Sequence, residues 1–181
     1  MSPVTAQQCR WHEEGGGQAA AAQCLAFLDR IGIEVDWLEA GQEAQLLDGL
    51  AIVGGRLLVD PATPVWPGDL LHEGGHIAVC DPSARPALGP IEADGGDEMA
   101  SLAWSYAAAL ACGLPVEQLF HSGGYRGDGP WLAETFSAGH YIGAPLLGFF
   151  GMTAPDGAGP DCNQPRFPQM RHWLRQDCPT S

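Results

Sequence analysis

The residues best suited to chemistry lie in the segment Asp69–Val79, which reads DLLHEGGHIAV. It contains the pattern His-Glu-x-x-His, with His72 and His76 four residues apart. In a helix such residues lie about 40° apart around the axis and one turn apart along it, so both imidazoles can bind one divalent metal. Glu73 lies beside that stripe, where a carboxylate can take a proton from a water near the metal without being a ligand. The pattern therefore predicts a metal centre with Glu73 as the general base.

The alternative is a helix in which these side chains only form hydrogen bonds, because so short a pattern also occurs in helices that bind nothing. Apolar neighbours favour the metal, since buried histidines need partners or a metal to offset the cost of burial. These neighbours are Leu70, Leu71, Ile77, Ala78 and Val79. Gly74 and Gly75 each cost about 1 kcal/mol relative to Ala inside a helix. We therefore expect a close packing neighbour at both glycines.

A catalytic zinc usually has three protein ligands and keeps a fourth position for water, so a third ligand is needed. A histidine six residues after His76 would complete one common arrangement, but Pro82 occupies that position. The other common arrangement uses a glutamate from a following helix. Glu98 begins an Ala-rich segment that can approach the motif helix closely, and it is the predicted third ligand, although a carboxylate in a first turn can also serve the helix dipole. The other possible ligands are Asp94, Asp97, His121 and His140.

The elements that must position these residues can be read from periodicity and turn signals. Alternating polarity predicts a strand at residues 33–38, and the Gly54-Gly55 pair predicts a hairpin of residues 50–53 and 56–59. Helices are predicted at residues 18–30, from Pro67 through the motif, at 98–112, 116–120, 131–138 and 145–150, with a last turn or two at 167–175. Residues 1–16 are expected to be a loose lead-in. We expect one α+β domain of residues 1–181, with a small sheet packed on the metal-binding helix and a mostly helical C-terminal half.

Charge and cysteine content restrict the partners and the compartment. Eight Lys+Arg against 22 Asp+Glu give a net charge of −14, which repels nucleic acid and anionic membranes. No apolar run of about 20 residues and no secretory signal are visible, so we expect no membrane span and a cytoplasmic protein. The six cysteines form no Cys-x-x-Cys pair. Cys24, Cys80 and Cys112 lie in apolar stretches and are expected to be free buried thiols, whereas Cys162 and Cys178 could pair in an oxidising compartment. The oligomeric state is not predicted.

Residues 50–115 resemble the gluzincin type of zinc metallopeptidase, in which His-Glu-x-x-His precedes a glutamate ligand on a later helix. The resemblance implies a zincin-like fold, one Zn²⁺ per chain held by His72, His76 and Glu98, and a peptide or protein substrate. The hairpin ahead of the motif helix is similar to the upper sheet of those enzymes, where one strand can bind an extended peptide. More loosely, residues 97–115 are similar to the ligand helix of the small ImmA/IrrE-type metallopeptidases.

One departure from the family and the second catalytic donor leave the function open. Many gluzincins carry an aspartate four residues after the ligand glutamate to hold a histidine, and here that position is Leu102. The expected function is a zinc hydrolase that cleaves a restricted peptide, because 181 residues leave little room for a deep cleft. The alternatives are a zincin-like metal-binding regulator or interaction module with little activity, and a purely structural helix. Candidate donors to the transition-state oxyanion are His121, Tyr125, His140 and Tyr141.

Overall fold

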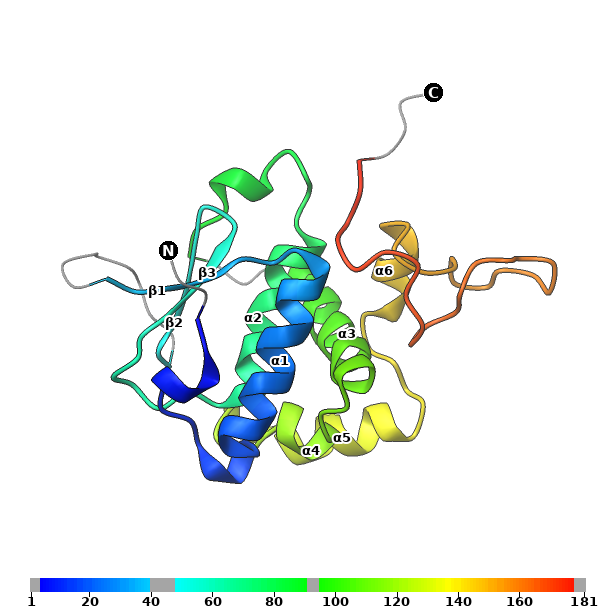
Figure 1. Ribbon diagram of the computed structural model, residues 1–181. Helices are drawn as coiled ribbons and strands as arrows, with labels where there is room; N and C mark the ends of the chain where they lie inside the picture. The colour runs from blue at the N-terminus through cyan, green and yellow to red at the C-terminus, as the bar shows by residue number, and fades with distance from the viewer. Residues whose placement is uncertain (1–3, 40–47, 91–94, 178–181) are drawn as a thin grey trace.

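The computed structural model describes residues 4–39, 48–90 and 95–177 of the chain. Over these residues the fold is mixed α+β, with six α-helices and one three-stranded sheet. Helices α1 (Gly17–Ile31), α2 (Pro67–Val79) and α3 (Gly95–Cys112) lie side by side (Figure 1). Helix α2 carries the His-Glu-x-x-His motif and packs against α1, α3 and the sheet. The motif therefore lies on the helix that connects the two halves of the fold.

The sheet has the strand order β1-β3-β2. Strands β2 (Leu50–Val53) and β3 (Arg56–Val59) are antiparallel, and β1 (Val35–Trp37) pairs with β3 in parallel. Gly54 and Gly55 have φ values of 61° and 72° and form the tight turn between β2 and β3, a backbone that L side chains rarely adopt. The predicted hairpin is thus confirmed, and its central strand is buried from Leu57 to Val59.

The predicted helices are present, with boundaries that differ by a few residues at most. Helix α1 ends at Gly32, whose φ of 87° gives the left-handed turn typical of a helix C-terminus. Helix α2 begins at Pro67, which suits a first helical position because its nitrogen has no hydrogen to leave unpaired. The remaining helices of the described chain are α4 (Val116–Leu119), α5 (Gly129–Ser137) and α6 (Ala144–Phe149).

The C-terminal end of α2 is held by two arginines. The Arg85 guanidinium donates hydrogen bonds to the carbonyl oxygens of Ile77 at 3.0 Å and Cys80 at 3.1 Å, and also to that of Arg175 at 2.9 Å. The Arg175 backbone N–H donates to the Ala78 carbonyl at 2.9 Å. These bonds satisfy carbonyl groups that have no partner within the helix, so the motif helix is anchored at its far end.

The described part of the lead-in, residues 4–16, is more ordered than we expected. It forms two 3₁₀ turns, Ala6–Gln8 and Glu13–Gly15, and buries the side chains of Val4 and Ala6. The indole N–H of Trp11 donates to the Ala6 carbonyl at 2.7 Å. The segment therefore packs on the core, because its few apolar residues cover an edge that α1 leaves open.

The predicted helical turn at residues 167–175 is wrong. No helix forms there, and the backbone N–H groups of Arg171 and His172 donate to the carbonyl of Met152, outside the segment. Trp173 packs edge-on against Phe27 of α1, with ring centroids 4.9 Å apart, and its carbonyl accepts a bond from the Trp104 indole at 2.9 Å. Contacts with the core therefore override the local preference. Within the described residues, no helix combines the length and apolar character needed to cross a membrane.

Candidate metal centre

His72, His76 and Glu98 converge from two helices. Both histidine Nε2 atoms face the Glu98 carboxylate: His72 Nε2 lies 3.4 Å from Oε1, and His76 Nε2 lies 3.4 Å from Oε2. One ligand atom from each of the three residues lies within 4.8 Å of the others. His76 is buried, whereas Glu98 keeps about 36% of its side chain exposed, so the group has a buried side and a solvent side.

The spacing of these atoms fits a metal. Two ligands bound at about 2.0–2.1 Å in a tetrahedral arrangement lie about 3.4 Å apart, which is the separation observed here between each imidazole nitrogen and the carboxylate. Two neutral imidazoles and one carboxylate suit Zn²⁺ and other divalent transition metals alike. The donor set is therefore able to hold one divalent ion with three protein ligands.

The two glycines of the motif set the distance between α2 and its neighbours. A Cβ at Gly75 would lie 2.6 Å from the Ser101 hydroxyl oxygen and 3.1 Å from the Ser101 carbonyl oxygen on α3. A Cβ at Gly74 would meet the end of the Leu28 side chain on α1, at 2.9 Å. The expected close packing neighbours are thus confirmed. The Ser101 hydroxyl also donates to the His72 carbonyl at 2.7 Å, which ties the ligand histidine to the helix that carries Glu98.

We expect Gly75→Ala to destabilise the protein by about 1–3 kcal/mol, because backbone of α3 must shift to admit the methyl group. Gly74→Ala is the matched control: it meets only a flexible side chain and gains up to about 1 kcal/mol of helix propensity, so its stability should stay within about 1 kcal/mol of wild type. Denaturant unfolding of both variants measures the difference. Equal stabilities would show that the α2–α3 contact does not depend on Gly75.

The carboxylates around the site have shifted acidities. Burial raises the pKa of Glu73, and the charges of Asp69 and Glu98 add to this effect, while His72 and His76 oppose it. Hydrogen bonds from His72 and His76 hold the pKa of Glu98 well below its usual range. Glu98 therefore stays ionised as a ligand must, whereas Glu73 is the more basic carboxylate, as a general base requires.

The pKa of His72 predicts how the site responds to pH. Burial lowers this pKa, but the hydrogen bond and charge of Glu98, with the charges of Glu73 and Asp69, raise it above 6.5 overall. A metal binds the neutral imidazole, so protons compete with zinc up to a higher pH than at a free histidine. We expect zinc affinity to fall by about tenfold or more per pH unit below the raised pKa.

Zinc titrations between pH 5 and 8 measure this dependence, and an affinity that is flat across the range would contradict it. The metal-free protein should respond in the opposite sense. The raised pKa of His72 stabilises the fold below pH 6.5, and this contribution is lost as pH rises through the raised value. The depressed pKa of Glu98 stabilises the fold above its ordinary 4.5, and is lost only at much lower pH. Without metal, the pair should thus contribute most between about pH 4.5 and 6.5.

Tyr125 lies against His72, with ring centroids 5.5 Å apart in an edge-on arrangement. Its hydroxyl donates to the Leu119 carbonyl at 3.2 Å. Tyr125 and Arg126 have φ values of 54° and 53°, so this loop holds a backbone that is unusual for residues other than glycine. Because its hydrogen is already donated to Leu119, Tyr125 is placed to orient the His72 ring and not to donate to a substrate.

A buried pair that the sequence did not suggest lies one turn before the motif. His121 Nε2 donates to Asp69 Oδ1 at 2.7 Å, and the imidazole stacks on Trp66 with ring centroids 4.2 Å apart. His12 stacks on Trp66 as well, at 4.4 Å. The available signal was the position of Asp69, three residues before His72 on the same helix face. His121 is thus occupied by Asp69 and is not one of the residues gathered around Glu98.

The outer nitrogens of the ligand histidines have no protein partner in the described part of the chain. His72 Nδ1 and His76 Nδ1 are both buried without a hydrogen-bond partner, as is Nδ1 of His121. Leu102, at the position where many gluzincins have an aspartate, is buried among apolar residues. The absence of a brace expected from the sequence is therefore matched by unpaired imidazole nitrogens among the residues described.

The other candidates lie elsewhere or cannot be placed. Tyr141 belongs to an aromatic cluster with Tyr106 and Phe167, at centroid distances of 5.7 and 4.8 Å. His140 is exposed in the loop after α5. Asp97 lies in the first turn of α3 beside Glu98, outside the three-residue metal group. Asp94 lies outside the described residues.

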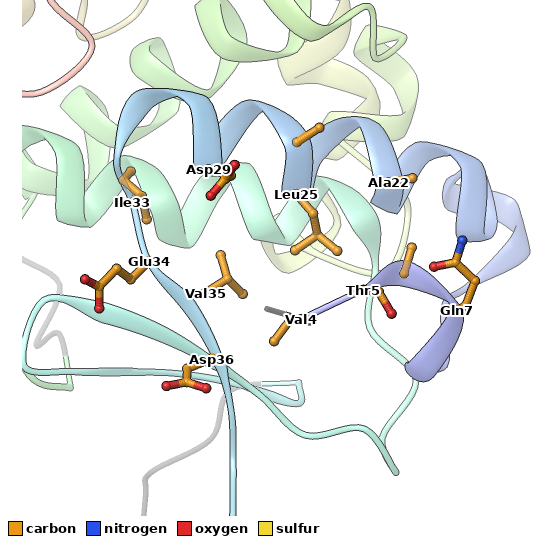
Figure 2. A pocket seen from close by; sticks show the side chains of 12 residues that line it. Val4, Thr5, Gln7, Ala22, Leu25, Asp29, Ile33, Glu34, Val35 and Asp36 are labelled. Carbon is orange, nitrogen blue, oxygen red and sulfur yellow. The ribbon is translucent and has the colours of Figure 1, made fainter. Parts of the chain in front are cut away.

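A pocket of about 500 Å³ lies away from this centre, between α1, β1 and the N-terminal turn Ala6–Gln8. Figure 2 shows the side chains of Val4, Leu25 and Val35 around it. Its lining includes no residue of α2 or α3, so the pocket belongs to a different part of the molecule from the metal centre.

Comparison with known proteins adds no family to this picture. No protein-family model, no curated protein and no solved structure matches the chain. The geometry of the two helices therefore carries the functional argument alone.

Proposed function

We propose that this protein is a metal-dependent hydrolase, a zincin-like metallopeptidase that cleaves a restricted peptide with one Zn²⁺ per chain. The observation that carries the proposal is the convergence of His72, His76 and Glu98, with the buried Glu73 on the same helix. A hairpin ahead of the motif helix and a glutamate helix after it support the gluzincin-like reading.

Each residue has a role in this reaction. His72, His76 and Glu98 hold the ion and leave one position open. Zinc, when bound there, supplies Lewis acidity and makes water at the open position more acidic. Glu73 takes the proton of the attacking water and passes it to the leaving amine, and its raised pKa suits the exchange. The pair Asp69–His121 and the Tyr125 ring support this face of α2 from the side.

A second candidate function is a metal-binding protein with little catalysis, acting as a regulator or interaction module. Two observations favour it: the unpaired Nδ1 atoms of His72 and His76, and the commitment of the Tyr125 hydroxyl and His121 to other partners. A brace on a ligand histidine typically improves metal affinity or activity by about 10–100-fold, so its absence weakens a site without abolishing it.

The test combines metal content with turnover. Purified protein is assayed for bound metals, then incubated with a peptide library before and after chelation and zinc return. One zinc per chain with cleavage that chelation removes and zinc restores supports the peptidase. One zinc without cleavage supports the binding protein. No metal after zinc is supplied would overturn both and leave a structural helix.

A further inference from the structure

A pair of cysteines far apart in the sequence meets where α1 packs against α3. Cys24 is fully buried in the middle of α1, and Cys112 is the last residue of α3 and partly exposed. The two thiols share a side-chain hydrogen bond, and both are free. Their sulfur atoms therefore already lie within reach of each other, with one facing solvent and one facing the core.

The two thiols differ in acidity. The hydrogen bond from Cys24 lowers the pKa of Cys112 to about 7, aided by the backbone N–H of Leu114 and the charge of Arg30, although burial acts in the opposite direction. The same hydrogen bond, together with burial, raises the pKa of Cys24. Near neutral pH, Cys112 is the nucleophilic thiolate and Cys24 is the thiol that donates to it.

Other cysteines of the described chain lack this combination. Burial and the nearby Asp60 carboxylate raise the pKa of Cys9 to about 11. Burial also raises the pKa of Cys80. Cys112 is thus more reactive than either, and it has a second thiol in contact, as peroxide-sensitive pairs require.

We propose that Cys24 and Cys112 form a reversible disulfide when the protein meets a hydroperoxide, which links α1 covalently to α3. The Cys112 thiolate attacks one peroxide oxygen: an S–O bond forms, the O–O bond breaks, and the departing hydroxide takes a proton to give water. The Cys24 sulfur then attacks the Cys112 sulfenic acid, an S–S bond forms, and the S–O bond breaks. The thiol proton of Cys24 leaves with the second hydroxide as water, so two thiols are oxidised and one hydroperoxide is reduced.

The bond would enclose the candidate metal centre. The chain between Cys24 and Cys112 contains the sheet, α2 and the three ligands His72, His76 and Glu98. Closing so long a loop restricts the unfolded chain strongly, and we expect the Tm to rise by about 5–15 °C on oxidation. A reductant reverses the change.

The experiment exposes the full-length protein to one equivalent of hydrogen peroxide at pH 7.5, counts free thiols and maps disulfides after trypsin digestion. The sequence contains arginine but no lysine, and Arg85 precedes a proline, so Cys24 lies in the fragment 11–30 and Cys112 in the fragment 57–126. We expect free thiols to fall from six to four, these two fragments to be linked, and a reductant to restore six.

Variants assign the bond to the proposed pair. Fragment 57–126 also contains Cys80, so the link should persist in Cys80→Ser and disappear in Cys112→Ser. Six thiols remaining after treatment, a link that survives in Cys112→Ser, or a link between Cys162 and Cys178 in its place would overturn the proposal. Cys112→Ser is partly exposed and should fold even if Cys24→Ser does not. Zinc content is measured on the same samples, so loss of the metal centre is seen separately.

Discussion

Replacing Glu73 with Gln should lower the turnover of a cleaved peptide by about 10²–10⁴-fold while the protein keeps its zinc. Glutamine has nearly the same shape as glutamate but cannot accept a proton from the attacking water. Because Glu73 is not among the residues that face one another as ligands, the metal should stay bound at full stoichiometry. Turnover and bound zinc are measured on the same preparation of the variant.

The matched control is Glu117→Gln, an exposed glutamate in the first turn of α4. It makes the same chemical change on the same charge balance, and it should leave turnover at the wild-type level. Wild-type turnover in Glu73→Gln would remove Glu73 from the mechanism. A loss of zinc in that variant would instead make Glu73 a ligand and require a new assignment of the base.

His76→Ala and Glu98→Ala should each weaken zinc binding by more than about 100-fold, because loss of a mere supporting partner already costs 10–100-fold. His76 is buried against α3 and contributes an imidazole 3.4 Å from the carboxylate, so its removal leaves only two ligands. Zinc content after dialysis and competition with a chelator of known affinity measure the change. The Tm of the metal-free variants shows whether the fold itself is intact.

The control for the ligand variants is His140→Ala, which removes an exposed histidine on a different loop and should keep one zinc per chain. Zinc retained at wild-type affinity in Glu98→Ala would move the third ligand to Asp94 or Asp97. Zinc retained in His76→Ala as well would show that the metal lies elsewhere on the protein.

Local patterns were sufficient for the elements that carry the site. Gly54-Gly55 between two apolar runs predicted the β2–β3 hairpin, and Pro67 predicted the start of α2, because turn and cap chemistry depends on a few neighbouring residues. The four-residue spacing of His72 and His76 placed both imidazoles on one face for the same reason. The need for a close neighbour at Gly75 was also visible, since glycine in a helix interior is costly without one.

Tertiary structure decided which distant groups meet. Glu98 could be chosen from several acidic residues only by a guess about helix packing, and the structure brings its carboxylate to both imidazoles. Nothing near Asp69 in the sequence pointed to His121, and nothing near Cys24 pointed to Cys112. Residues 167–175 carried a helical pattern, yet Trp173 packs into the core instead. Periodicity reports which face of an element is apolar, but not which side chains meet across the core, because that depends on how whole elements pack.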